Sequence, residues 1–349
     1  MEGVKVQDSP DWLKQRLEAL GLNSINNLVD VANYVMLLTG QPLHIFDYDK
    51  LTGSGKKEIV VRKANNGETI TGLDNNEYTL NNDMLVIADN QNVLGVAGIK
   101  GGKIAEVDKN TTNIVIESAH FEPVGIRKTS RALGLQTDAS WRFERNVPVC
   151  FTTMGLGTTV AHIQSVAGGR VGGAVDENTT TEHKLNIQVQ FEEVNQLIGV
   201  EVQKQQVIDV LEKLEFVIEQ KGDTLNTTPP QFRLDVAIKE DVIEEVVRMY
   251  GYENVAQQAI STHTASKQHN TTHQTITTAP CNLGFFELHN SVFIAKQTVP
   301  VSFADCFIEV QNPVNKEKPL LCPSPIFNVI DTAQHNIRYH GVDNLKFLK

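Results

Sequence analysis

Four acidic residues are the clearest candidates for cation chemistry in this 349-residue chain. Asp241, Glu244 and Glu245 have the i, i+3, i+4 spacing that places side chains on one face of a helix, and Asp235 ends a strand-like run just before them. Carboxylates at close range repel one another unless a cation or a basic group lies between them, and clustered oxygen ligands favour Mg²⁺. The spacing predicts either a magnesium site or an acidic, solvated helix face, and the residue pattern alone leaves both open.

A second set of residues has the types that line a pocket for a polar ligand. Asn33 lies in a helical pattern, and His44 follows a Gly-Gln-Pro-Leu turn. Gly98 and Gly101 belong to a tight turn, where missing side chains let a ligand approach the backbone. Glu117 ends a β-branched run, so it is either a half-buried acceptor for a ligand hydroxyl or a salt-bridged surface residue. From the pattern alone, structural roles for these side chains are the commoner outcome.

A third feature is a basic run that contains Arg127, Arg131, Arg142 and Arg145 within 19 residues. It is too polar for a core element, and its three large apolar side chains are too many for a linker. The formal net charge of −11 argues against a nucleic-acid binder held by phosphate contacts alone. A local basic patch on an acidic body remains compatible with this charge, so the run predicts a site or an interface.

The elements that position these residues alternate between helical and strand patterns. Ser9 is predicted to be the N-cap, and Pro10 the first residue, of a helix that Gly21 ends. Residues 25–38 form a second predicted helix with Leu28, Val31, Val35 and Leu38 on one side. Between 57 and 120, short β-branched runs at 59–62, 85–88 and 113–117 alternate with Gly and Asn turns, which predicts a sheet. Residues 151–167 again have a helical pattern. This part is expected to form one domain over residues 1–175.

A second unit is predicted over residues 182–256. A strand at 185–189, helices at 191–198 and 205–215, a strand at 232–238 and a helix that ends at Gly251 fit a small α+β domain. Residues 257–280 carry few large apolar side chains and predict a polar linker. Residues 281–349 have weak strand character and are expected to form a third, partial domain. The fold class is therefore mixed α/β and α+β, with several domains.

The lengths of the apolar segments and the spacing of the cysteines indicate where in the cell the protein is located. No segment approaches the ~20 apolar residues that span a bilayer, and the first residues lack an apolar signal region. The four cysteines are far apart and form no Cys-x-x-Cys pair, which favours thiols in a reducing compartment. We expect a soluble cytoplasmic protein without a membrane or DNA partner.

Several of these runs together resemble the beta subunit of bacterial phenylalanyl-tRNA synthetase. The resemblance is strong over residues 1–256 and faint over 257–349, where the runs at 312–318 and 336–347 are similar to the start of the family's catalytic-like domain. The matching runs are Ser24–Val35, Gly40–Asp47, Leu85–Asp89, Gly98–Gly102, Glu117–Phe121, Leu133–Ser140 and Phe232–Asn254. The resemblance implies an incomplete editing domain, a small winged-helix-like domain and a partial catalytic-like domain, in a partial or truncated subunit.

The resemblance also implies roles for the candidate residues. By this resemblance, acids at the positions of Asp235, Asp241, Glu244 and Glu245 bind a magnesium ion shared with the alpha subunit. The alpha subunit would hold the aminoacylation site, and ATP would be a substrate of the whole enzyme. In the editing pocket, which hydrolyses tyrosine wrongly attached to the phenylalanine tRNA, Glu117 reads the tyrosine hydroxyl. Asn33 and His44 form its wall, and Gly98 and Gly101 its floor. A buried acceptor of this kind separates Tyr from Phe by up to ~10⁴–10⁵.

This chain departs from the family pattern at several positions. Ala32 stands where the family usually has Thr, Asn146-Val147-Pro148 replaces the usual Gly-Val-Asp, and Cys322 replaces a frequent Arg. We therefore consider three functions: a ligase beta subunit that assembles with alpha and tRNA, a freestanding hydrolase of mischarged tRNA, and a non-catalytic remnant that only assembles with a partner.

Overall fold

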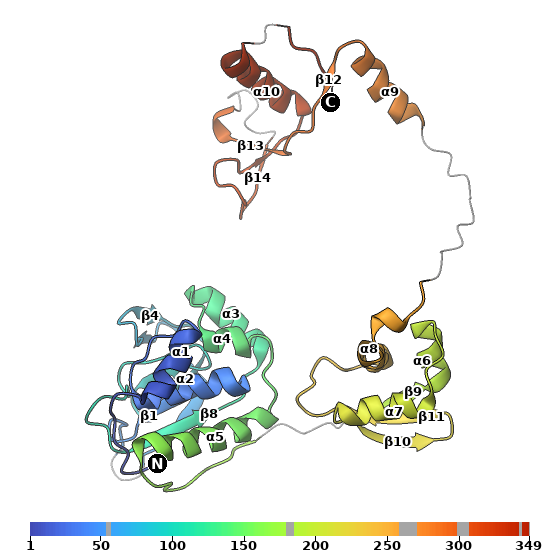
Figure 1. Ribbon diagram of the computed structural model, residues 1–349. Coiled ribbons are helices and arrows are strands. Elements are labelled where there is room, and N and C mark those ends of the chain that lie inside the picture. Colours follow the sequence, from blue (N-terminus) through green and yellow to red (C-terminus); the bar gives the residue numbers. More distant parts are fainter. Residues whose placement is uncertain (54–56, 179–184, 258–270, 299–306, 342–343, 349) are drawn as a thin grey trace. The chain divides into compact units, whose positions relative to one another are not determined.

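Figure 1 shows the computed structural model of the chain, which describes all residues except 54–56, 179–184, 258–270, 299–306, 342–343 and 349. The chain divides into two compact units, Met1–Gln257 and Gln258–Lys349. Within the first unit, residues 4–167 and 187–246 build separate hydrophobic cores. Helices and several small sheets occur throughout, which confirms the mixed, multi-domain fold class; the predicted domain boundaries stay predictions.

The first part of the chain contains helices on a scaffold of short antiparallel strands. Strands β2, β5, β6 and β7 form one sheet in that order, β3 pairs with β4, and β1 pairs with β8. The strands predicted at 59–62, 85–88 and 113–117 are confirmed, each to within one residue. The elements are α1 (Asp11–Ala19), α2 (Asn27–Thr39), β1 (Leu43–Asp47), β2 (Val60–Lys63), β3 (Thr69–Thr71), β4 (Glu77–Thr79), β5 (Leu85–Ala88), β6 (Val93–Val96), β7 (Lys100–Gly101), β8 (Ile114–Ser118), α3 (Pro123–Leu133), α4 (Asp138–Phe143) and α5 (Cys150–Ala167).

The β1–β8 pair is the element that positions most of the candidate site. Its antiparallel register places His44 opposite Glu117, although the two residues are 73 positions apart in the sequence. Helix α2 contacts β1, helix α5 contacts β8, and the two helices contact each other. The predicted apolar face of α2 is buried at Leu28, Val31 and Val35, whereas Leu38, one residue before the end of the helix, is 59% exposed.

Local caps begin and end these helices. The Asn26 side chain accepts hydrogen bonds from the backbone amides of Leu28 and Val29, and Gly40 ends the helix in the left-handed conformation with φ of 81°. The prediction that Ser9 caps α1 is wrong. Pro10 is the N-cap, and the Ser9 hydroxyl instead donates a hydrogen bond to the buried Asp30. A charged acceptor in a dry environment competes successfully for the hydroxyl.

Two glycines in α5 offer a matched stability test. A Cβ on Gly157 would meet nothing within 4 Å, whereas a Cβ on Gly155 would lie 2.7 Å from Cγ of the buried Gln41. We expect Gly157→Ala to raise the free energy of unfolding by about 1 kcal/mol, because alanine costs less backbone entropy in a helix. Gly155→Ala should lower it by about 1–3 kcal/mol through overpacking. Urea denaturation of both variants measures the difference, and equal effects would contradict the packing at Gln41.

Residues 187–254 form a small α+β body. Strand β11 lies between β10 and β9 in an antiparallel sheet, and the apolar faces of α6, α7 and α8 complete the core. The predicted strand at 232–238 is wrong: this segment follows two prolines and forms turns, so it supplies no sheet edge. The elements are β9 (Ile187–Gln190), α6 (Phe191–Ile198), α7 (Lys204–Lys213), β10 (Val217–Lys221), β11 (Thr224–Thr228), α8 (Lys239–Tyr250) and the 3₁₀ turn η1 (Tyr252–Asn254).

The described residues of the unit Gln258–Lys349 contain short strands and two α-helices. The predicted linker at 257–280 is partly wrong, because α9 covers residues 271–280 of it; a helix satisfies its backbone hydrogen bonds locally and does not require a core. Residues 258–270 of that linker lie outside the described residues. The elements are α9 (Thr271–Asn282), β12 (Phe286–Glu287), β13 (Phe293–Ile294), the 3₁₀ turn η2 (Lys296–Thr298), β14 (Ile308–Glu309), β15 (Leu320–Leu321), α10 (Pro325–His340) and β16 (Phe347–Leu348).

Among the described residues, no helix has both the length and the apolar character needed to cross a bilayer.

Candidate functional site

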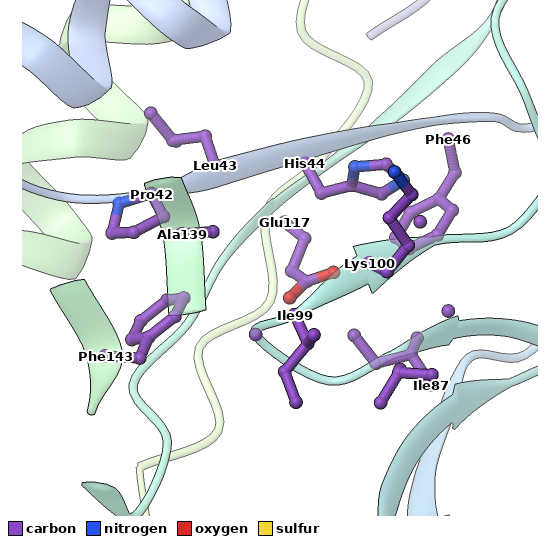
Figure 2. A pocket seen from close by; sticks show the side chains of 14 residues that line it. Pro42, Leu43, His44, Phe46, Ile87, Ile99, Lys100, Glu117, Ala139 and Phe143 are labelled. Carbon is purple, nitrogen blue, oxygen red and sulfur yellow. The ribbon is translucent and has the colours of Figure 1, made fainter. Parts of the chain in front are cut away.

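A small cavity lies where β1 and β8 meet the β6–β7 turn and α4. Its walls include four of the predicted site residues, His44, Gly98, Gly101 and Glu117. Figure 2 shows the Glu117 carboxylate near the centre of these side chains, with the His44 ring beside it. The cavity volume is about 80 Å³, which is less than the ~150 Å³ of an apolar cavity that admits benzene. An aromatic ring would therefore enter only in part, or by displacing a movable wall.

Glu117 is the chemically unusual group in this cavity. The residue is half-buried, but its Oε2 atom is shielded from solvent and has no hydrogen-bond partner among the described residues. Burial without a compensating cation raises the pKa of the Glu117 carboxyl to about 7. An unpaired buried acceptor costs free energy until a ligand donates to it. The site is thus prepared for a hydroxyl or another hydrogen-bond donor.

His44 faces the same space from the neighbouring strand. Directly opposed residues of an antiparallel pair carry their side chains on one face, with Cβ atoms about 5 Å apart. Burial lowers the pKa of the His44 imidazole to about 4, so the ring is neutral at pH 7. The ring also packs edge-on against Phe46, with centroids 4.5 Å apart. His44 therefore offers a fixed neutral hydrogen-bonding group and no positive charge for Glu117.

Gly98 and Gly101 lie so close to neighbouring side chains that a Cβ atom would not fit at either position. Gly98 has φ of 66°, and a Cβ there would lie 2.8 Å from Phe121 and 2.9 Å from Phe143. A Cβ on Gly101 would lie 2.5 Å from Cε1 of His44. Both glycines line this cavity. The space freed at Gly101, however, is occupied by the histidine ring.

Gly101→Ala tests this contact. We expect the added methyl group to displace the His44 ring and to reduce binding of any ligand in the cavity at least tenfold, because neither strand can move without breaking its register. The chemical shifts of the His44 ring measured by NMR report the displacement. Gly157→Ala provides the control that adds the same methyl group in open space. An unmoved His44 ring in Gly101→Ala would contradict the described packing.

Residues that the sequence did not single out complete the cavity. Ile87 and Ile99 provide apolar walls, and Ala139 and Phe143 of α4 face in from the basic run. The side chain of Lys100 also lines the cavity, and its ammonium group lies 3.3 Å from a carboxylate oxygen of Asp74. Only the position of Lys100 between two predicted glycines could have indicated its role.

The four acids of the small α+β body, residues 187–254, do not converge on one point. Asp235 pairs with Arg233 through two contacts of 2.9 and 2.6 Å, and Nη2 of Arg233 also donates to Glu245 at 2.7 Å. Glu245 is buried and pairs with Arg248 as well. Ion pairing with Arg233 lowers the pKa of both carboxyl groups. Arginine therefore supplies the positive charge that the acids need.

The remaining two acids have other roles. Asp241 accepts hydrogen bonds from the backbone amides of Ala237 and Ile238, at 2.8 and 2.9 Å, which begins α8 and lowers the pKa of its carboxyl. Glu244 is exposed, although it adjoins the buried Glu245. Within the described part of the chain, no group of three or more His, Cys, Asp or Glu side chains is arranged to hold a metal ion.

Comparisons with known proteins agree on one family. A B3/4 domain model matches residues 1–168, and a tRNA synthetase B5 domain model matches residues 187–252. The phenylalanine–tRNA ligase beta subunit of Wolbachia sp. subsp. Brugia malayi is 34% identical over 99% of this chain and 43% of its own length. The chain belongs to the phenylalanine–tRNA ligase beta-subunit family. It spans less than half the length of these curated relatives.

Other members of the family show similar agreement. The beta subunit from Fusobacterium nucleatum is 36% identical over 98% of this chain and 43% of its own length. That from Protochlamydia amoebophila is 44% identical over 73% of this chain and 32% of its own length. An N-terminal fragment of the Pyrococcus horikoshii phenylalanyl-tRNA synthetase beta subunit matches with a TM-score of 0.36 and 18% identity over 71% of this chain and 69% of that chain, a likeness too slight to carry an argument.

Two family expectations take a different form in this structure. Ala32 is buried in the core that α1 and α2 share, and Asn33 is not among the residues that line the cavity. Helix α2 therefore contributes no donor to the cavity wall from these positions.

The four acids do not fit a magnesium ion in this arrangement. Asp235 and Glu245 pair with arginine, Asp241 caps α8, and Glu244 is exposed. The magnesium site remains a prediction from the family resemblance.

Proposed function

We propose that this chain acts as part of the beta subunit of a phenylalanine–tRNA ligase. Its relatives carry that name, and two domain models of the family match in order along residues 1–252. The whole enzyme would attach phenylalanine to its tRNA at the expense of ATP, with the aminoacylation site in an alpha subunit. This chain would contribute assembly surface, tRNA contacts and a hydrolytic editing pocket.

The observation that supports editing is the unpaired Oε2 of Glu117 at the centre of the cavity. The phenolic hydroxyl of a misattached tyrosine would donate to this oxygen, whereas phenylalanine would leave it unpaired. A buried group that loses its partner discriminates strongly, by up to ~10⁴–10⁵ between tyrosine and phenylalanine. Glu117 would thus read the substrate, and the ester would be cleaved elsewhere along the bound amino acid.

Water would be the nucleophile in this reaction. It would attack the ester carbon, and the ester bond to the tRNA would break to release tyrosine and the tRNA hydroxyl. The imidazole of His44, with its pKa near 4, is a weak base at pH 7. His44 would therefore act by orienting the ligand or the water, and catalysis would depend mainly on positioning.

Co-purification with an alpha subunit and measurement of tyrosine release test the proposal together. We expect the full chain to assemble stoichiometrically with a purified alpha subunit and the complex to release tyrosine from Tyr-tRNA faster than phenylalanine from Phe-tRNA. Tyrosine release by the chain without alpha would instead support a freestanding hydrolase. Assembly without any release would support a non-catalytic role, and failure to assemble would contradict the proposal.

A further inference from the structure

We propose that the outer faces of α3 and α4 bind the single-stranded end of the RNA whose attached amino acid enters the cavity. This inference rests on the proposed function and assigns a surface that the editing chemistry does not use. Its basis is that α4 has one face in the cavity and an aromatic and basic opposite face, next to uncompensated cations on α3.

Helix α4 links the two sites geometrically. Ala139 and Phe143, four residues apart, line the cavity. Trp141 lies two positions from each, which is about 200° around a helix of 3.6 residues per turn, and its side chain is 47% exposed. A ligand group on this outer face is therefore separated from the cavity by about the width of one helix, ~10 Å. One extended molecule could contact both faces.

Trp141 and Arg145 form a stacking platform. The guanidinium of Arg145 lies 4.2 Å from the centroid of the indole ring, and its Nη1 donates to the Trp141 carbonyl oxygen. Arg145 also pairs with Glu144 at 2.6 Å, and Arg142 pairs with Asp138 at 3.3 Å. Exposed aromatic rings and guanidinium planes are the surfaces on which unpaired bases stack in single-stranded RNA complexes.

Helix α3 supplies the charge. Arg127, Lys128 and Arg131 are exposed, and none of the three forms an ion pair within the described residues. These three side chains lie outside the buried stripe of α3, which includes Ile126 and Ser130, and α3 contacts α4 directly. Between residues 122 and 145 there are five basic and three acidic residues, in a chain whose net charge is −11. Such a local excess of positive charge attracts phosphates.

The chemistry favours RNA over an acidic protein segment. Lysine and arginine side chains alone would serve either partner. The exposed Trp141 with its stacked arginine adds a flat apolar surface that bases use and that an acidic peptide does not require. The adjacent cavity, with its acceptor for a hydroxyl, is matched to an amino acid carried on the end of such a strand.

Binding of a short fluorescent single-stranded RNA to the full chain tests the surface. We expect Trp141→Ala to raise the Kd about 5- to 150-fold, the range for losing one stacked base, and Trp141→Phe to retain most of the affinity. Arg127→Glu/Arg131→Glu should raise the Kd about tenfold or more at low salt. It should also make log Kd less sensitive to log salt, because each lost phosphate contact reduces the slope by about 0.7.

Lys63→Glu/Lys109→Glu is the matched control. It makes the same change in net charge at two exposed lysines outside α3 and α4. We expect it to change the Kd less than threefold. Equal losses in the two double variants would show that total charge alone governs binding and would overturn the proposal. Circular dichroism of each variant confirms that the loss does not arise from unfolding.

Two further measurements separate this proposal from the proposed function. Glu117→Gln should leave the Kd for RNA unchanged while tyrosine release falls. If the wild-type complex releases no tyrosine but the α3 and α4 variants still lose RNA affinity, the surface stands and editing fails. If these variants keep their RNA affinity but lose assembly with the alpha subunit, the surface is a protein interface and the proposal is overturned.

Discussion

Glu117→Gln should lower the ratio of kcat/KM for tyrosine release to that for phenylalanine release by about 100-fold. The amide keeps the size of the side chain but cannot accept the phenolic hydrogen with a charged oxygen, and hydrogen bonds to charged groups contribute about 1.5–3 kcal/mol. Rapid-quench assays on the assembled complex with Tyr-tRNA and Phe-tRNA measure the two rates. An unchanged ratio would show that Glu117 does not read the hydroxyl.

The pH dependence gives this prediction a second readout. With a pKa of about 7, the Glu117 carboxyl changes from acid to carboxylate as the pH rises through neutrality. We expect tyrosine release by the wild-type complex to rise across this range, since the carboxylate is the stronger acceptor. The Glu117→Gln profile should lack this step. Asn33→Ala, on a residue outside the cavity lining, should keep it.

Stability should change in the opposite direction to activity. Because the folded pKa of Glu117 lies above the unfolded value of 4.5, its protonated form stabilises the fold at low pH, and this contribution is lost as the pH rises from 4.5 through 7. At pH 8 the buried charge costs on the order of 3 kcal/mol. Glu117→Gln should therefore be more stable than the wild type at pH 8, and the two should be similar at pH 4. Urea denaturation at both pH values checks this. A group retained at such a cost is typical of a functional site.

Arg233→Met should lower the free energy of unfolding of the small α+β body, residues 187–254, by about 2–4 kcal/mol. Arg233 is the common partner of Asp235 and Glu245, and Glu245 is buried. Removing one partner of a buried ion pair leaves an uncompensated charge, which costs about 3–5 kcal/mol. The exposure of Asp235 and the remaining contact from Arg248 reduce this loss. Denaturant titration followed by circular dichroism measures the change.

Two variants control for the loss of charge. Lys221→Met removes a surface pair with Glu219, in which both side chains are at least 70% exposed, and should cost less than about 1 kcal/mol. Arg233→Met/Glu245→Gln removes the buried charge together with its partner and should recover part of the lost stability. If the double variant is less stable than Arg233→Met, the packing of the arginine matters more than its charge.

Acid titration tests the same ion pairs. The folded pKa values of Asp235 and Glu245 lie below their ordinary values, so their contribution is present above the unfolded pKa values of 3.8 and 4.5 and is lost as the pH falls through the folded values. The stability of Arg233→Met should therefore depend less on pH in this range. Added Mg²⁺ should not raise the Tm of the wild-type chain. A rise would show that the acids bind the ion in another arrangement.

Much of the local structure could be predicted from the sequence, because periodicity, caps and glycines act over short distances. The helices at α2, α5 and α8 and the strands β5 and β8 follow their apolar patterns. The failures have tertiary causes. The Ser9 hydroxyl donates to a buried carboxylate instead of capping a helix, and the run at 232–238 has strand-like residues but forms turns.

Candidate residues of the site could also be chosen from the sequence, but which of them are neighbours in space could not. Glu117 and His44 could be chosen from their types and motifs, whereas only the antiparallel register of β1 and β8 makes them neighbours. For the acids, the spacing predicted a shared helix face. In the folded chain, however, Glu245 is buried against Arg233, whereas Glu244 is exposed to solvent. Side-chain type is a property of the chain, while burial and pairing depend on contacts between residues that are distant in sequence, and these exist only in the folded molecule.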